Sequence, residues 1–185
     1  INFRFSGLPP MTIFVDTNIP IHYHPLDQIN WKDVVGTDDI LLMFSVIVFD
    51  ELDKHTRNPR LASRAKKLRK DIYNFITNGV VKEKVKAQGI EKPNIKKLEE
   101  LGLDSTQNDQ WILATVKLYV QSHPKEDVRI LTADFGMKVR AESLKIATII
   151  LDDKYEIKEE NEEQKENKKL KDELVKLRNA KPKLD

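Results

Sequence analysis

Four short apolar runs, separated by longer and more polar segments, restrict the folds open to this chain. The runs cover residues 12–15, 40–44, 128–131 and 146–151. Each has the length of a strand, is rich in β-branched residues and shows little polar alternation, which is typical of strands covered on both faces. We therefore expect a sheet whose two faces are both buried.

The segments between the runs have the period of helices. Residues 59–78 carry apolar side chains at helical spacing and end at Gly79, a residue suited to the left-handed position after a helix. Residues 108–122 repeat the pattern. Strands that alternate with helices predict a three-layer α/β/α domain with a central parallel sheet.

Length and composition predict one folded domain. The chain has 185 residues, 39% apolar and 34% charged, enough to bury one core of the usual size. The absence of cysteine excludes disulfides and thiolate zinc sites and suits a reducing compartment, so we expect a cytoplasmic protein. No apolar run approaches the roughly 20 residues of a membrane-spanning helix. The net charge is only +2, so any basic surface must be local.

Composition also divides the chain into three segments. Residues 1–10 have no signal-peptide ending and precede Met11, so we expect an upstream or vector-derived segment. Residues 11–156 hold the α/β pattern, and residues 157–185 are mostly Lys, Glu and Asn. The regular apolar positions of this last segment are Leu170, Leu174 and Leu177. Their spacing fits a solvated helix that leads to a further domain after residue 185, or a coiled coil that joins copies into a homo-oligomer.

Acidic residues stand where predicted strands and helices meet. Asp16 directly follows residues 12–15, and Asp134 comes soon after residues 128–131. In a doubly wound sheet, ligands bind outside the carboxyl ends of the strands, so these two acids should share one edge. Glu51 and Asp109 lie near the starts of predicted helices. We expect the four carboxylates to converge.

Converging carboxylates indicate a cation, because unpaired acids raise one another's pKa and destabilise the fold. Oxygen ligands without histidine or cysteine select Mg²⁺ or Mn²⁺ rather than zinc. Such a site supports phosphodiester hydrolysis by a metal-activated water. Each acid also has a structural alternative: Asp109 as a first-turn helix residue and Asp134 as a helix cap are the clearest.

The spaced segments "FVDTN", "VFDELDK", "NDQWILATV" and "ILTADFGMKVRAE" resemble a PIN-domain nuclease, the family named after the PilT N-terminus. The likeness covers about residues 12–155. It is greatest to PIN domains fused to PhoH-type ATPases, which share the E-L-D-K segment and the L-T-x-D followed by R-A. The resemblance implies a three-layer sheet, bound Mg²⁺ or Mn²⁺, and cleavage of single-stranded RNA.

Carried over position by position, the resemblance implies an acidic tetrad with two polar neighbours. The tetrad is Asp16, Glu51, Asp109 and Asp134, serving as metal ligands and catalytic residues. Asn18 and Thr132 would orient the first and last acids. Asp104 competes with Asp109 for the third place, and we prefer Asp109 because it directly precedes the "ILATV" helix. Many relatives carry a further acid or asparagine after the final Asp, where this chain has Phe135 and Gly136.

Basic residues near the acids are candidates for holding RNA phosphates. The candidates are Arg57, Arg60 and Arg64 after Glu51, and Lys138 and Arg140 after Asp134. The lysines and arginine at 66–70 form the solvated face of a predicted helix. The sequence thus predicts a metal-dependent endoribonuclease, with an RNA-binding or scaffolding module and a structure-specific DNA nuclease as alternatives.

Overall fold

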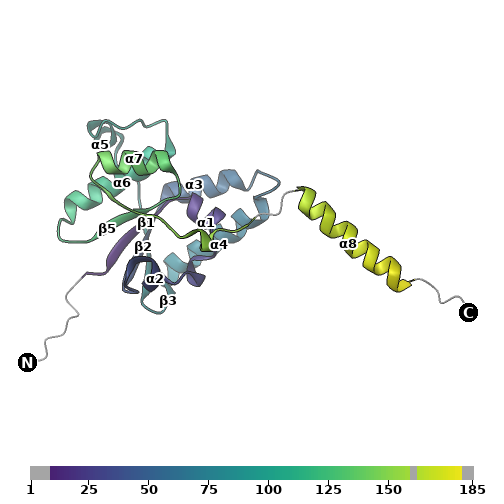
Figure 1. Cartoon of the computed structure of the whole chain (residues 1–185). Coiled ribbons are helices and arrows are strands. Elements are labelled where there is room, and N and C mark those ends of the chain that lie inside the picture. The colour runs from purple at the N-terminus through teal and green to yellow at the C-terminus, as the bar shows by residue number, and fades with distance from the viewer. Residues whose placement is uncertain (1–8, 159–161, 181–185) are drawn as a thin grey trace, which may run out of the picture.

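The computed structural model describes residues 9–158 and 162–180, whose six strands form one sheet. Figure 1 shows this sheet between helices. The strands are β1 (Met11–Val15), β2 (Ile40–Ser45), β3 (Val80–Lys82), β4 (Val85–Ile90), β5 (Val128–Leu131) and β6 (Ala147–Ile149). Their order in the sheet is β3-β4-β2-β1-β5-β6, and every pair is parallel except β3 with β4. The expected three-layer α/β/α fold is confirmed.

Helices connect the strands and cover both faces of the sheet (Figure 1). They are α1 (Asn18–His22), α2 (Trp31–Val35), α3 (Val46–His55), α4 (Ala62–Asn78), α5 (Ile95–Glu100), α6 (Asn108–Ser122), α7 (Phe135–Ser143) and α8 (Glu162–Ala180), with two 3-10 turns, η1 (Leu26–Gln28) and η2 (Asp153–Tyr155). In the described part of the chain, no helix combines the length and the apolar character that a bilayer span requires.

Alternate residues of the central strands pack into two separate cores. Ile13 and Val15 of β1 point into a core that α1, α3 and α4 close, whereas Phe14 points into the opposite core, closed by α6 and α7. Because both faces are buried, the strand carries almost no polar residue, which is the pattern the sequence displays.

The predicted elements agree with the structure where the apolar signal is continuous. Residues 12–15, 40–44 and 128–131 are strands, and 108–122 is α6 throughout. The fourth predicted run, 146–151, is a strand only over Ala147–Ile149. The helix predicted over 59–78 begins at Ala62, because residues 59–61 form a turn, and it ends as expected on Gly79, whose φ is 73°.

The strands β3 and β4 were not predicted. They form an antiparallel pair at one edge of the sheet, and the sequence "VKAQGI" of β4 alternates buried and exposed residues over its first four positions. Their polar side chains kept them from standing out as apolar runs. The central parallel sheet therefore carries one antiparallel edge strand, which is common in α/β domains.

The two ends of the chain fall partly outside the described residues. Residues 1–8 of the expected upstream segment are among those not described. On the other side, Ile157 N still donates to the carbonyl of His22 at 2.8 Å, so contacts of the sheet domain reach one residue past the expected boundary at 156. The helical tail is present as α8, and Leu170, Leu174 and Leu177 are exposed on it.

Candidate active site

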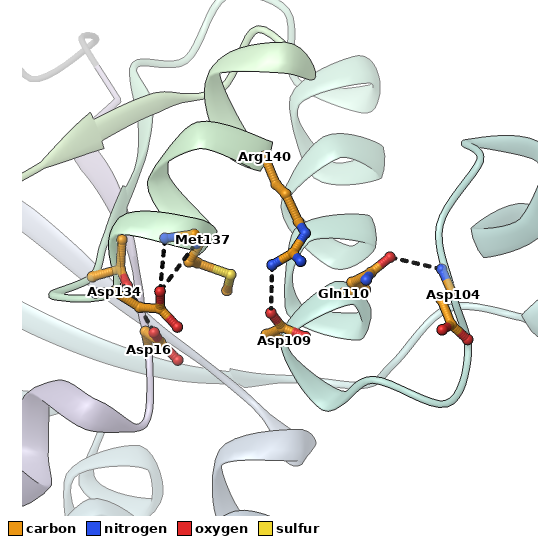
Figure 2. Close-up of polar contacts among 9 residues, drawn as sticks. Asp16, Asp104, Asp109, Gln110, Asp134, Met137 and Arg140 are labelled. Carbon is orange, nitrogen blue, oxygen red and sulfur yellow. Dashed lines mark hydrogen bonds and ion pairs between the residues drawn. The ribbon is translucent and has the colours of Figure 1, made fainter.

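An open cleft of about 380 Å³ lies outside the carboxyl ends of β1 and β5. All four predicted acids line it, together with one basic and four neutral polar residues. The full lining is Asp16, Asn18, Glu51, Lys54, Thr106, Gln107, Asn108, Asp109 and Asp134. Figure 2 shows Asp16, Asp109 and Asp134 approaching this space from β1, α6 and α7. The sequence prediction that the acids converge is thus correct at the level of the cleft.

Asp16 is the most enclosed of the four acids, with 5% of its surface exposed. Its Oδ1 accepts a hydrogen bond from the backbone N–H of Thr17 and its Oδ2 one from the hydroxyl of Thr132, each at 2.8 Å. The parallel register sets this up, because Val15 pairs with Leu131 and Asp16 N donates to the Leu131 carbonyl. The carboxylate is therefore held rigidly at the strand ends.

The pKa of the Asp16 carboxyl lies above its ordinary value of 3.8. Burial is the largest cause, because it removes water from the charged form. The hydrogen bonds from Thr132 and Thr17 lower the pKa, and the nearby charges of Asp134 and Asp109 raise it. The ionised form is thus costly to keep in the cleft.

Glu51 reaches the cleft from the second turn of α3. Ser45 caps the start of that helix by accepting from the N–H of Ile47 at 3.2 Å. The hydroxyl of Thr17 donates to Glu51 Oε1 at 3.1 Å. Burial raises the pKa of Glu51, as do Asp16 and Asp109, whereas the Thr17 hydrogen bond and the charge of Lys54 lower it.

Asp134 has a structural role as well as a place in the cleft. Its Oδ1 accepts from the N–H groups of Gly136 and Met137, at 2.8 and 3.4 Å, and so caps α7 (Figure 2). The alternative interpretation of this acid as a helix cap is correct. The cap engages one carboxylate oxygen, and Asp134 as a whole is solvent-exposed.

Asp109 lies in the first turn of α6 and forms an ion pair with a basic side chain. Arg140 Nη1 lies 3.3 Å from Asp109 Oδ2, which links α7 to α6 (Figure 2). Asp104, the competing acid, does not line the cleft; its carboxylate accepts from the N–H and hydroxyl of Thr106, and its own N–H donates to Gln110. Of the two competing acids, Asp109 therefore lines the cleft and Asp104 does not.

As the side chains stand, the acids line one cleft without forming a closed cage. Within residues 9–158 and 162–180, no three Asp, Glu, His or Cys side chains are close enough to hold one ion together. Asp109 is turned to Arg140, and each oxygen of Asp16 accepts a hydrogen bond.

Of the two predicted orienting residues, Thr132 fills the expected place. Asn18 lines the cleft but makes no hydrogen bond to any of the four carboxylates in the described part of the chain. Thr17 joins Asp16 to Glu51 instead, and sequence reasoning missed it. Lys54 was missed too, although its place three residues after Glu51 on a helix could have signalled it.

The predicted RNA-binding residues are not among the described residues that line the cleft. Arg57 and Arg60 are exposed after α3, and Lys138 is half-buried on α7. Arg64 Nη1 donates to the carbonyl of Ile21 at 3.1 Å, which ties α4 to α1. Arg140 faces Asp109. The last two side chains therefore have structural partners that the sequence did not reveal.

Comparison with known proteins settles the family. A PIN domain family matches residues 13–152, which is most of the chain. The chain belongs to the PIN domain family. A solved structure described as a domain of a functionally unknown protein from Methanocaldococcus jannaschii DSM 2661 has the same fold, with a TM-score of 0.51 at 16% identity over 82% of this chain and 95% of that chain. No curated protein matches.

Membership of the PIN domain family indicates the kind of reaction that the cleft supports. PIN domains are generally nucleases, which hydrolyse phosphodiester bonds, and they generally use divalent metals. In this PIN domain the acids come from four places in the chain, and the matched region of residues 13–152 contains all of them. The cleft is accordingly the candidate active site.

Proposed function

We propose that this PIN domain is a metal-dependent endoribonuclease that cleaves single-stranded RNA in the acid-lined cleft. The observation that carries the proposal is the gathering of Asp16, Glu51, Asp109 and Asp134 around one open space at the strand ends. Acids brought together at a cost to folding are typical of functional sites.

The donors in the cleft fit Mg²⁺ or Mn²⁺. They are carboxylate oxygens, with no histidine or cysteine among the lining residues. Burial raises the pKa of both Asp16 and Glu51, so a cation would relieve an existing strain. A side chain at Gly136 would crowd Asp134, because its Cβ would lie 3.2 Å from Asp134 Oδ1. The four acids would hold the ion.

A bound divalent ion would lower the pKa of a water and stabilise negative charge on phosphate oxygens. The chain's own residues prepare the cleft for this. Thr17 and Thr132 fix the orientation of Asp16 through their hydrogen bonds. Lys54, exposed at the cleft wall, offsets the charge of Glu51 and can attract a phosphate.

The RNA strand would be held by basic side chains on either side of the cleft. Those we propose are Arg57 and Arg60 beyond α3, and Lys138 and Arg140 on α7. Arg64 would act through the position of α1, because its guanidinium binds the Ile21 carbonyl. An open cleft can take the interior of a strand, which supports endonucleolytic cleavage. The preference for RNA and the likeness to PhoH-fused PIN domains rest on the sequence motifs.

Cleavage assays on purified protein test the proposal. Labelled single-stranded RNA, single-stranded DNA and a DNA flap are incubated with Mn²⁺, with Mg²⁺ and with EDTA. We expect internal cuts in the RNA with metal only. Asp16→Asn should lower the rate by at least about 100-fold, whereas Asp104→Asn, which removes an acid outside the cleft, should leave it unchanged. Equal cleavage by both variants would assign the activity to another site or a contaminant.

Metal binding can be measured separately from turnover. An ion that binds only the folded protein at a hundred times its dissociation constant raises the free energy of unfolding by about 2.7 kcal/mol. We expect Mn²⁺ to raise the melting temperatures of the wild type and of Asp104→Asn. The melting temperature of Asp16→Asn should rise much less. A melting temperature that does not respond to Mn²⁺ in the wild type would argue against a metal site.

A second candidate function has one observation in its favour. The Asp109–Arg140 pair neutralises one acid, and the described acids form no closed cage. These features suit a PIN fold that binds RNA, or serves as a scaffold, without cutting. RNA binding without metal-dependent cleavage of any substrate in the assay would favour this alternative.

A further inference from the structure

The outer face of α7 carries two exposed apolar side chains beside the cleft. Phe135 directly follows Asp134 and has 79% of its surface exposed, and Val139, one turn later, has 65%. On the inner face, Met137 and Ala141 are fully buried. These inner residues already anchor α7 in the core. Packing of the folded chain therefore does not explain why a phenyl ring is exposed at residue 135.

The backbone that carries Phe135 is fixed by a cleft residue. Asp134 lines the cleft, and its Oδ1 accepts from the N–H groups of Gly136 and Met137, which belong to the first turn of α7 (Figure 2). The backbone of Phe135 is therefore held in place directly after the proposed metal ligand. An RNA strand that left the cleft along α7 would reach Phe135 before the later residues of the helix.

Cations accompany the ring. Lys138 lies three residues after Phe135 and so on the same side of the helix. Arg140, on the same helix, pairs with the cleft residue Asp109. Aromatic rings that stack on bases, set among cations that bind phosphates, are what single-stranded nucleic acids require of a binding surface. Two apolar side chains are too few for a stable protein interface, which buries about 1,000 Å² or more.

We propose that Phe135 is a stacking platform for an unpaired base next to the phosphodiester in the cleft, and that it gives the cleft its preference for single strands. The proposal rests on the function proposed above and adds a residue that selects the substrate. A base inside a duplex is covered on both faces by its neighbours, so the ring can stack only on a base that is unpaired or terminal. The platform accepts any base, because each has an aromatic face.

Binding in EDTA tests the platform without any need for cleavage. The full chain is titrated into a fluorescent single-stranded RNA, the same RNA paired with its complement, and a strand of the same length without bases. Phe135→Ala should weaken binding of the single strand roughly 5- to 150-fold, the range for losing one stacked base. Binding of the duplex and of the abasic strand should not change. Val139→Ala, which removes the neighbouring exposed side chain, should change binding less than twofold.

Phe135→Trp provides a positive variant and a direct signal. It should retain affinity, and its indole should be quenched by the single strand but not by the abasic strand. The resident Trp31 and Trp111 are buried, and the wild-type protein measures their contribution to the signal. Circular dichroism should show the same fold for each variant, because the replaced side chain is exposed.

Four outcomes would overturn the proposal. They are equal binding of the single strand by the wild type and Phe135→Ala, an equal loss on the abasic strand, an equal loss in Val139→Ala, and a change of mass in Phe135→Ala that reveals a contact between copies. Base-dependent binding without cleavage would reject the nuclease and keep the platform. Cleavage that is indifferent to Phe135 would do the reverse.

Discussion

At the scale of single residues, Asp16 couples the stability of the fold to the cleft. Its pKa is higher in the folded protein than its ordinary value of 3.8, so between these two values the folded state binds more protons than the unfolded state. The free energy of unfolding therefore falls as pH rises through this window. At neutral pH the ionised carboxylate is a net cost to the fold.

Replacing Asp16 by Asn should remove that cost. The amide can still accept from Thr17 N–H and can donate to the Thr132 hydroxyl, so the geometry is kept. We expect Asp16→Asn to be more stable than the wild type at neutral pH without metal, with a flatter dependence on pH above 3.8. Urea unfolding at several pH values measures this.

Asp104→Asn is the matched control, because the pKa of Asp104 is shifted in the opposite direction to that of Asp16. Hydrogen bonds from Thr106 hold the pKa of Asp104 below its ordinary value. That acid therefore contributes stability above the ordinary pKa, and the contribution is lost as pH falls through the lowered one. Asp104→Asn should be slightly less stable at neutral pH. A gain in stability in this variant, or a loss in Asp16→Asn, would contradict the description of the two acids.

At the scale of elements, Asp134 performs two tasks that substitution can separate. Asn caps helices about as well as Asp, whereas Ala loses the cap at a cost of about 1 kcal/mol. Asp134→Asn should therefore keep the stability of α7, and Asp134→Ala should lose about that amount in chemical denaturation. Both should lose metal-dependent cleavage. If Asp134→Asn cleaves RNA at the wild-type rate, this acid is a cap and no more.

The elements also show where sequence reasoning succeeds and where it ends. β1, β2 and β5 were predictable because burial on both faces leaves an apolar run that needs no knowledge of neighbours. The acids after β1 and β5 were predictable as neighbours for the same reason. β4 was missed because its side chains alternate, and the role of Thr17 was missed because its partner Glu51 is 34 residues away. Likewise, the partner that Arg140 finds in Asp109 exists only once α6 and α7 pack.

At the scale of the whole molecule, α8 can be removed without touching the cleft. Its side chains described at residues 165–180 are all exposed, so a chain that ends at Lys158 should differ in free energy of unfolding by no more than about 0.5 kcal/mol. Ending at Glu156 should cost about 1 kcal/mol more, because Ile157 N–H then no longer donates to His22. Thermal and urea unfolding compare the two chains.

Light scattering of the same chains tests the coiled-coil hypothesis. If Leu170, Leu174 and Leu177 join copies of the chain, the full-length protein should have a higher mass than the chain that ends at Lys158. A monomeric mass for both would leave α8 as a solvated helix and would contradict the homo-oligomer hypothesis.

The pairing of β1 with β5 has a consequence for when the cleft exists. Val15 lies beside Leu131 in the sheet, although 115 residues lie between them along the chain. Contacts so distant form late, because the intervening chain must first be present and be folded back. During translation, Asp16 leaves the ribosome long before Thr132 and Asp134 do. A nascent chain therefore carries its first acid without the second strand that orients it, and the cleft is assembled only when synthesis of the domain is nearly complete.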